Sequence, residues 1–312
     1  MSAWRRALRH ALMLVGVALF VVACAEWPDT PTVRRLDADP TRVGDQGDAG
    51  PHGVGCSRVR RQLHVTDGVT LQVCWPTAAD GSLAPGGPFP GVALLAGGLV
   101  DPARYDWLVT HLASRGAIVV VPEFSFDLAI LDLEPAYVAT QLLRDAAPGG
   151  AATGLLQGAV RVDNGLAVVG HSLGGVVATR LWLDEPDIGA LVLLASYPDD
   201  GDDVTARAGD PVLSLGGTQD KVALASDVRA GFERFAPPRW LAMVEGMHHA
   251  GWTDGVPDDE LVGDGVPTRP IDELRQDAMR LLDAFLDAHV SGLASGWARL
   301  NDGVFPRLTV TR

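Results

Sequence analysis

Lysine is almost absent from this sequence. Lys221 is the single lysine among 25 basic residues, which are outnumbered by 39 acidic residues, so the formal net charge is -14. Binding to nucleic-acid phosphates needs a cationic surface, and the excess of negative charge excludes nucleic acid as an expected partner. Charged residues make up only 21% of the chain and hydrophobic residues 47%. This balance excludes a disordered protein, and 312 residues suffice for one large or two small domains with a well-buried core.

Long apolar runs are also lacking. Residues 11–23 are apolar and follow an arginine-rich start, but the run is too short to cross a bilayer comfortably, which favours a secretory signal over a membrane span. It ends Val21-Val22-Ala23-Cys24, which resembles the lipobox of bacterial lipoproteins. The resemblance implies a signal peptide over residues 1–23 and a lipid on Cys24; an ordinary signal peptide cleaved nearby is the alternative. Residues 24–55, rich in Pro, Asp, Gly and Thr, predict a flexible tether.

Cysteine is scarce, with three residues in all. Outside the cytosol Cys56 and Cys74 could form a disulfide. Thr66-Asp67-Gly68 predicts a hairpin turn between them, but a two-residue turn places Cys74 opposite Arg61, so a bridge would require the chain to fold back near Ser57. Two unrelated buried thiols are the alternative.

Short apolar runs alternate with amphipathic stretches from Val59 onward, which predicts an α/β fold with a mostly parallel sheet of about eight strands and helices on both faces. A domain over residues 56–290 is expected, with 291–312 as an irregular C-terminal extension. The acidic loop 199–210 is short, so little or no cap domain is expected. The predicted strands are 63–65, 69–73, 91–96, 118–121, 166–169, 190–195, 212–215 and 240–244, and the predicted helices are 102–114, 135–145, 176–183 and 271–290.

One motif stands at the centre of this pattern. Gly170-His171-Ser172-Leu173-Gly174 fits G-x-S-x-G and lies between a predicted strand and a predicted helix, the setting that a nucleophile elbow requires. A serine hydroxyl is a poor nucleophile, so it must be presented on a sharp turn where a base can reach it. A plain glycine-rich turn is the alternative. His171 is expected to be a structural neighbour and not the base.

Two later loops supply the residues that would activate the serine. Asp220 follows the strand predicted at 212–215, and His248 and His249 follow the strand predicted at 240–244. Side chains just past the carboxyl ends of parallel strands share one rim of the sheet. The chain order Ser, Asp, His is the order expected for this arrangement.

The remaining site predictions concern the oxyanion and the substrate. The amide of Leu173 and an amide of the Gly97-Gly98-Leu99 loop, that of Gly98 or Leu99, are the expected donors to the oxyanion. No metal or organic cofactor is expected, because the serine, histidine and aspartate require none. The acidic cluster at 199–203 lacks the spacing of a calcium loop, which favours a solvated loop there. The four candidate substrate-contacting side chains are Phe124, Phe126, Tyr197 and Trp252, and core packing is the alternative for Phe124 and Phe126.

Residues 63–290 resemble the α/β-hydrolase superfamily, and more narrowly its small, nearly capless branch related to dienelactone hydrolases and bacterial lipases. Besides the elbow, the resemblance is carried by 96–101 with Tyr105, by 126–131 and by 246–252. In that branch an alanine and then an aromatic follow the catalytic histidine, so His249, with Ala250 and Trp252, fits better than His248. Dienelactone-type relatives use a cysteine nucleophile, and this chain has serine.

The expected activity is hydrolysis of a small carboxylic ester through an acyl-enzyme, with Ser172 as nucleophile, His249 as base and Asp220 orienting the base. An acyltransferase or amidase on the same residues is one alternative, because fold and residues do not choose between these reactions. A non-catalytic binding lipoprotein is another. The expected location is the bacterial cell envelope, with a lipid anchor, or secretion. The sequence does not specify the acyl group, the alcohol or the oligomeric state.

Overall fold

The computed structural model describes residues 50–62, 68–124, 127, 132–255, 263–303, 305 and 307–312, and these belong to one compact unit. Several sequence predictions therefore lie outside the described residues: the signal peptide, the lipidated Cys24, most of the tether, the strand at 63–65 and Phe126.

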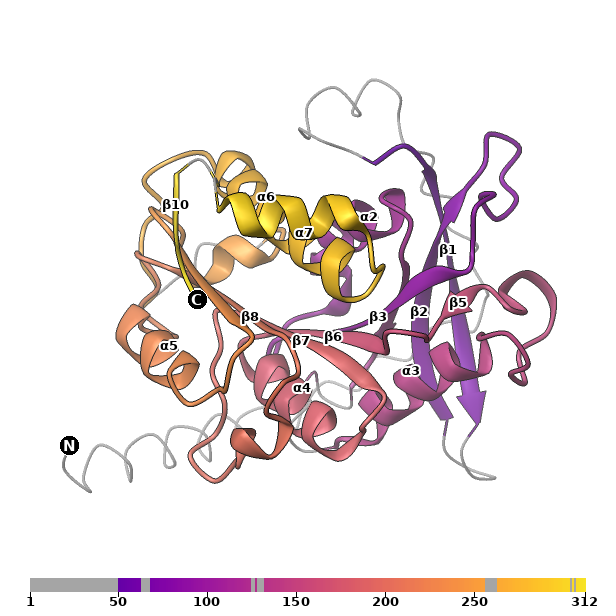
Figure 1. Ribbon diagram of the computed structural model, residues 1–312, viewed down its shortest axis with the longest axis horizontal. Helices are drawn as coiled ribbons and strands as arrows, with labels where there is room; N and C mark the ends of the chain where they lie inside the picture. The colour runs from indigo at the N-terminus through magenta and orange to yellow at the C-terminus, as the bar shows by residue number, and fades with distance from the viewer. Residues whose placement is uncertain are drawn as a thin grey trace, which may run out of the picture. The chain divides into compact units, whose positions relative to one another are not determined.

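The described residues form one open, mixed sheet of ten strands in the order β1-β2-β4-β3-β6-β7-β8-β9-β10, with β5 pairing with β3 (Figure 1). The pairs from β4 to β9 are parallel, whereas β1 and β2 at one edge and β10 at the other join antiparallel. The strands are β1 (Gly53–Gln62), β2 (Gly68–Thr77), β3 (Phe89–Leu95), β4 (Ile118–Pro122), β5 (Val160–Arg161), β6 (Leu166–His171), β7 (Ile188–Leu194), β8 (Val212–Gly217), β9 (Arg239–Val244) and β10 (Leu308–Thr311).

Strands β1, β5 and β10 have no counterpart among the predicted strands, so the sheet has ten strands where about eight were predicted. Strand β1 begins at Gly53, inside the stretch predicted as tether, and pairs along its length with β2. Strand β10 lies in the predicted C-terminal extension and pairs with β9 from Leu308↔Val244 to Thr311↔Leu241. Its four residues, Leu-Thr-Val-Thr, are half-buried and exposed in turn, an alternation typical of a strand with one solvent-facing side but only four residues long.

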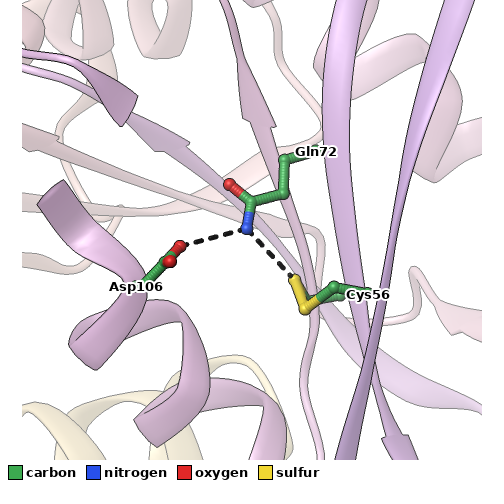
Figure 2. The surroundings of a disulfide bond; sticks show 4 residues. Cys56, Gln72 and Asp106 are labelled. Carbon is green, nitrogen blue, oxygen red and sulfur yellow. Dashed lines mark hydrogen bonds between the residues drawn. A yellow bond between two sulfur atoms is a disulfide. The ribbon is translucent and has the colours of Figure 1, made fainter. Parts of the chain in front are cut away.

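The register of β1 and β2 was predicted wrongly. Gln62 pairs with Gly68, so five residues separate the paired ends, and Cys74 lies opposite Cys56 where Arg61 was expected. The structure joins Cys56 and Cys74 by a disulfide with a Cα–Cα distance of 4.1 Å. Figure 2 shows the side chain of Gln72 reaching from β2 toward this disulfide and toward Asp106. This register, which the turn signal did not reveal, places the two cysteines opposite each other without a bend near Ser57.

Helices cover both faces of the sheet because its central strands are apolar on both sides. Alternate residues of β3 enter two separate cores: Val92 and Leu94 one, Ala93 and Leu95 the other. Helices α2 (Asp106–Ser114), α6 (Ile271–His289) and α7 (Ala294–Asp302) contribute to the first core, and α3 (Glu134–Asp145) and α4 (Leu173–Asp184) to the second (Figure 1). Helix α5 (Ala225–Phe232) also packs into the first core.

Short 3-10 turns lie between these elements. The helix predicted from Pro102 starts as the 3-10 turn η1 (Pro102–Tyr105), and the α-helix begins only at Asp106. The other turns are η4 (Gly154–Leu156), η5 (Val204–Arg207) and η6 (His249–Trp252). Turn η6 begins at one of the two histidines that the sequence singles out, directly after β9 in the chain.

Candidate active site

Ser172 lies at a strained turn between β6 and α4. Its φ is 52° and its ψ is -124°, a backbone conformation that residues with a side chain rarely adopt. The neighbouring glycines make the turn possible. A Cβ on Gly170 would lie 2.4 Å from the carbonyl oxygen of Gly174, and a Cβ on Gly174 would lie 2.3 Å from that of Ala96. The motif therefore folds as the strand–turn–helix that the sequence predicts.

Two hydrogen bonds fix the main chain of this turn. The Ser172 amide donates to the Leu194 carbonyl of β7 at 3.0 Å, and the Ser196 hydroxyl donates to the Ser172 carbonyl at 2.7 Å. The strained main chain of Ser172 is thus held in place by β7 and by the loop that follows β7. Ser196 is buried and has no counterpart among the site residues predicted from sequence.

The structure brings Ser172, His249 and Asp220 into one hydrogen-bonded line. The Nε2 of His249 lies 2.9 Å from the Ser172 Oγ, and its Nδ1 lies 2.8 Å from the Asp220 Oδ2. A carboxylate can only accept, so the proton between Asp220 and His249 belongs to Nδ1, and Nε2 is left to accept the serine proton. The three side chains follow β6, β9 and β8 respectively.

Asp220, the partner of this imidazole, is buried and accepts hydrogen bonds on both of its carboxylate oxygens. Its side chain is fully buried, while that of His249 is 13% exposed. Its other oxygen, Oδ1, accepts the amides of Val222 at 2.8 Å and Ala223 at 2.7 Å. Because buried polar oxygens must be satisfied by hydrogen bonds, these donors and the His249 ring stabilise the buried Asp220 side chain.

His248 is not part of this line. It is buried, and its Nδ1 has no hydrogen-bond partner within the described part of the chain. Burial lowers the pKa of His248 below its usual value, although Asp264 and Asp220 oppose that shift. Of the two adjacent histidines, His249 is therefore the one that reaches Ser172.

The oxyanion prediction needs one correction. Leu99, with a φ of 61°, donates its amide to the Asp127 carbonyl at 2.6 Å, so this amide is already engaged. The amide of Gly98 makes no hydrogen bond among the described residues. The amide of Leu173 stands in the first turn of α4, where a helix offers it no acceptor. Gly98 and Leu173 are thus the predicted donors that stay available.

Two of the four predicted substrate-contacting aromatics are buried in the cores. Trp252 is fully buried in the core on the α2 and α6 side, and Phe124 is buried in the core on the α3 and α4 side. Tyr197 is half-buried and packs against α5, where a Cβ on Gly231 would lie 2.4 Å from its Cβ. An aromatic residue in a loop after a strand has the same sequence signal whether it lines a pocket or fills the core.

Asp264 was missed by the sequence analysis. Its Oδ1 accepts the amides of His249 at 3.1 Å and Lys221 at 3.3 Å, and its Oδ2 accepts the Ala250 amide at 2.8 Å. Burial raises the pKa of Asp264, but these backbone donors and that of Gly265 outweigh it and lower the pKa below its usual value. No motif marks this residue, because its partners are main-chain groups of two distant loops.

The described residues contain no cluster of three or more His, Cys, Asp or Glu side chains arranged to hold a metal ion. Within the same residues, none of the helices has the length and apolar character needed to cross a membrane.

Comparison with known proteins agrees with this geometry. Residues 151–259 match the model of the alpha/beta hydrolase family, a stretch that includes Ser172, Asp220 and His249. No match was found among curated proteins. The matched stretch is similar to that family and includes the three hydrogen-bonded side chains.

Proposed function

We propose that this protein is a serine hydrolase that cleaves a carboxylic ester through an acyl-enzyme. The observation that carries the proposal is the unbroken line from the Ser172 Oγ through the His249 ring to the buried Asp220 carboxylate. A serine hydroxyl needs an adjacent base, and the base needs a third group to hold its tautomer.

In the proposed reaction the Ser172 Oγ attacks the ester carbonyl while His249 Nε2 takes the hydroxyl proton. Asp220 stabilises the imidazolium that forms, and the amides of Gly98 and Leu173 bind the oxyanion. His249 then gives the proton to the leaving alcohol, and the acyl group stays on Ser172. A water molecule, deprotonated by His249, attacks the acyl-enzyme and releases the acid and the free serine.

The test compares Ser172→Ala with Ser226→Ala, whose exposed hydroxyl lies on α5 away from the line. On a short activated ester, Ser172→Ala is expected to lower kcat by a factor of about 10⁴ or more. Ser226→Ala is expected to match the wild type. A fluorophosphonate probe should label wild-type Ser172, identified by peptide mass spectrometry. Unchanged hydrolysis by Ser172→Ala, or label on another residue, would show that the proposal is wrong.

The acyl acceptor requires its own measurement, since the same residues serve hydrolases and acyltransferases. Reaction in the presence of an added alcohol or amine, with products separated by chromatography, measures the partition of the acyl group. A proportion of acid that stays constant as the alcohol is raised supports hydrolysis. Preferential transfer to the alcohol or amine would replace the hydrolase proposal with a transferase.

We also propose that the protein is exported to the bacterial cell envelope and tethered by lipid on Cys24. The proposal is based on the arginine-rich start, the short apolar run and the residues that precede Cys24. The full chain expressed in a bacterium should appear in the membrane fraction with a lipid-sized mass increase on Cys24, and Cys24→Ser should abolish both. Recovery of wild type without that mass increase would contradict the anchor.

A further inference from the structure

Two fully buried polar side chains, Tyr105 and His171, lie behind the proposed catalytic line without belonging to it. The Tyr105 hydroxyl accepts the Gly97 amide at 2.8 Å and lies 2.7 Å from the Nδ1 of His171. Gly97 starts the loop that holds the predicted oxyanion donor Gly98, and His171 immediately precedes Ser172. Tyr105 therefore connects the oxyanion loop to the elbow.

The direction of the Tyr105–His171 hydrogen bond follows from counting protons. A buried phenol proton needs an acceptor, and the Tyr105 oxygen already accepts from Gly97. The phenol therefore donates to Nδ1, which makes His171 the neutral tautomer with its proton on Nε2. That Nε2 has no regular hydrogen-bond partner among the described residues. Burial raises the pKa of Tyr105, so the hydroxyl keeps the proton that it donates.

The ring of His171 also packs against the ring of His249, the proposed base. The ring centroids of His171 and His249 are 4.7 Å apart, with 38° between the ring planes. Burial lowers the pKa of His171 well below its usual value, and the neighbouring His249 lowers it further, whereas the main chain of His249 opposes the shift. A neutral ring at this position contacts His249 without repelling the imidazolium that forms when Ser172 attacks.

The three parts are packed too closely to move independently. A Cβ on Gly97 would lie 3.0 Å from the His171 Nδ1, 3.1 Å from the Tyr105 hydroxyl and 3.4 Å from the Ser172 Cβ. Position 97 thus favours glycine, because Tyr105, His171 and Ser172 fill the space that a side chain would need. A shift of the Tyr105 hydroxyl would be passed on both to the oxyanion loop and to the ring beside His249.

We propose that Tyr105 and His171 are positioning residues: their hydrogen bond fixes the Gly97–Gly98 loop relative to Ser172 and holds a neutral ring against His249. Neither touches the substrate. The inference rests on the proposed function, and it adds that oxyanion loop and base are aligned by one shared buried hydrogen bond. Misplacing the groups that act on the reacting atoms by a fraction of an ångström lowers turnover more than substrate binding.

The first experiment is a double-mutant cycle. Tyr105→Phe and His171→Phe each keep a buried ring and remove one end of the hydrogen bond, whereas His171→Asn places an amide oxygen near the position of Nδ1. With kcat normalised to titrated active sites, each Phe variant is expected to lose roughly 10- to 100-fold with KM changed less than about threefold. The double variant is expected to lose no more than the worse single variant, and His171→Asn to be more active than His171→Phe.

The results that would overturn the inference are equally specific. If Tyr105→Phe keeps kcat within about twofold of the wild type, or if the losses multiply in the double variant, the two residues do not act through one hydrogen bond. Ser172→Ala separates this outcome from failure of the proposed function. If Ser172→Ala is inactive and Tyr105→Phe is fully active, only the positioning role is wrong. If Ser172→Ala is active, both the proposed function and the positioning role are wrong.

The second experiment uses the unaltered protein and does not depend on any variant folding. Long-range ¹⁵N–¹H NMR reads the tautomer of each of the eight histidines, and the His171 ring is assigned through its bonded backbone resonances. The Nε2–H tautomer of a neutral His171 is expected at every pH from about 5 to 9. An Nδ1–H tautomer, or a ring that titrates in this range, would overturn the proposal.

Discussion

Asp264 holds His249 by its main chain: the carboxylate accepts the His249 amide at 3.1 Å, while the imidazole is free to face Asp220 and Ser172. The same carboxylate accepts the amide of Lys221, the residue after Asp220. A single side chain thus fixes the distance between the loop of the proposed base and the loop of the acid that orients it. The Gln219 amide, which donates to the Met247 carbonyl at 2.9 Å, adds a second tie between these loops.

Asp264→Ala is expected to weaken both folding and turnover. It leaves backbone amides of two loops without their acceptor, which should cost about 2–3 kcal/mol of unfolding free energy and lower kcat about tenfold. Urea denaturation and ester hydrolysis measure the two effects. Asp200→Ala is the matched control, because Asp200 is an exposed acid in the 199–203 cluster. If Asp264→Ala kept wild-type stability and kcat, Asp264 would have no role in holding the two loops together.

The contribution of Asp264 should also depend on pH in a defined direction. Burial raises the pKa of this carboxyl, but the amides of Ala250, Gly265, His249 and Lys221 lower it overall. A group with a lowered folded-state pKa stabilises the protein above its unfolded pKa of about 4, and that stabilisation is lost as pH falls through the folded value. The stability difference between wild type and Asp264→Ala should therefore be constant near neutrality and shrink below about pH 4. A difference that grows on acidification would contradict this assignment.

Gly174→Ala tests the close packing of the elbow. The added methyl would lie 2.3 Å from the carbonyl oxygen of Ala96 and 2.4 Å from that of Leu95, and both are main-chain atoms that cannot rotate away. We expect a loss of about 1–3 kcal/mol in stability, together with loss of ester hydrolysis. Gly201→Ala is the control, since its methyl would meet nothing within 4 Å. Thermal denaturation should leave Gly201→Ala unchanged, and equal melting temperatures for the two variants would contradict the packing.

The two adjacent histidines should differ sharply in their effect on turnover. His249→Ala removes the group 2.9 Å from the Ser172 Oγ and is expected to lower kcat about 10⁴-fold or more. Asp220→Asn should lower kcat by a comparable factor, since it favours the wrong tautomer of the ring. His248→Asn leaves the line intact and is expected to stay within about tenfold of the wild type. If His248→Asn were the inactive variant and His249→Ala the active one, the assignment of the base would be reversed.

Removal of the cross-strand disulfide should cost stability but not chemistry. Cys56 and Cys74 are separated by 18 positions, and a loop of that size contributes about 3 kcal/mol when closed. Cys56→Ala/Cys74→Ala is expected to lose about this much in urea denaturation while keeping its kcat, because the disulfide joins β1 and β2 at one edge of the sheet, whereas Ser172, Asp220 and His249 follow β6, β8 and β9. Mass spectrometry of the oxidised and reduced protein should differ by about 2 Da. Equal masses would show that the thiols do not pair.

The elbow was predictable because its signal is local. Gly170 and Gly174 lie two residues before and two residues after Ser172. A Cβ on Gly170 would clash with the main chain of Gly174, and a Cβ on Gly174 would clash with the main chain near the end of β3. Asp220 and His249 were predictable because parallel strands bring the loops at their carboxyl ends to one rim of the sheet. The sequences of β6, β8 and β9 are apolar enough to predict buried strands directly.

The predictions that failed depend on long-range packing. The register that places Cys74 opposite Cys56 was missed, because a three-residue turn signal did not give the number of residues between the paired ends of β1 and β2. Trp252 and Phe124 carry the same aromatic signal in a core as in a pocket. The Leu99 amide is engaged by Asp127, a residue of another loop, so its sequence position beside Gly98 could not reveal that it was already bonded.

The position of the single lysine has a practical consequence. Lys221 is exposed in the loop that directly follows β8, one residue after Asp220. In a protein whose α-amine is blocked, reagents that couple to amines would therefore attach every molecule through Lys221. A sensor or resin built this way would hold the folded domain in one orientation, with the Asp220 loop next to the support.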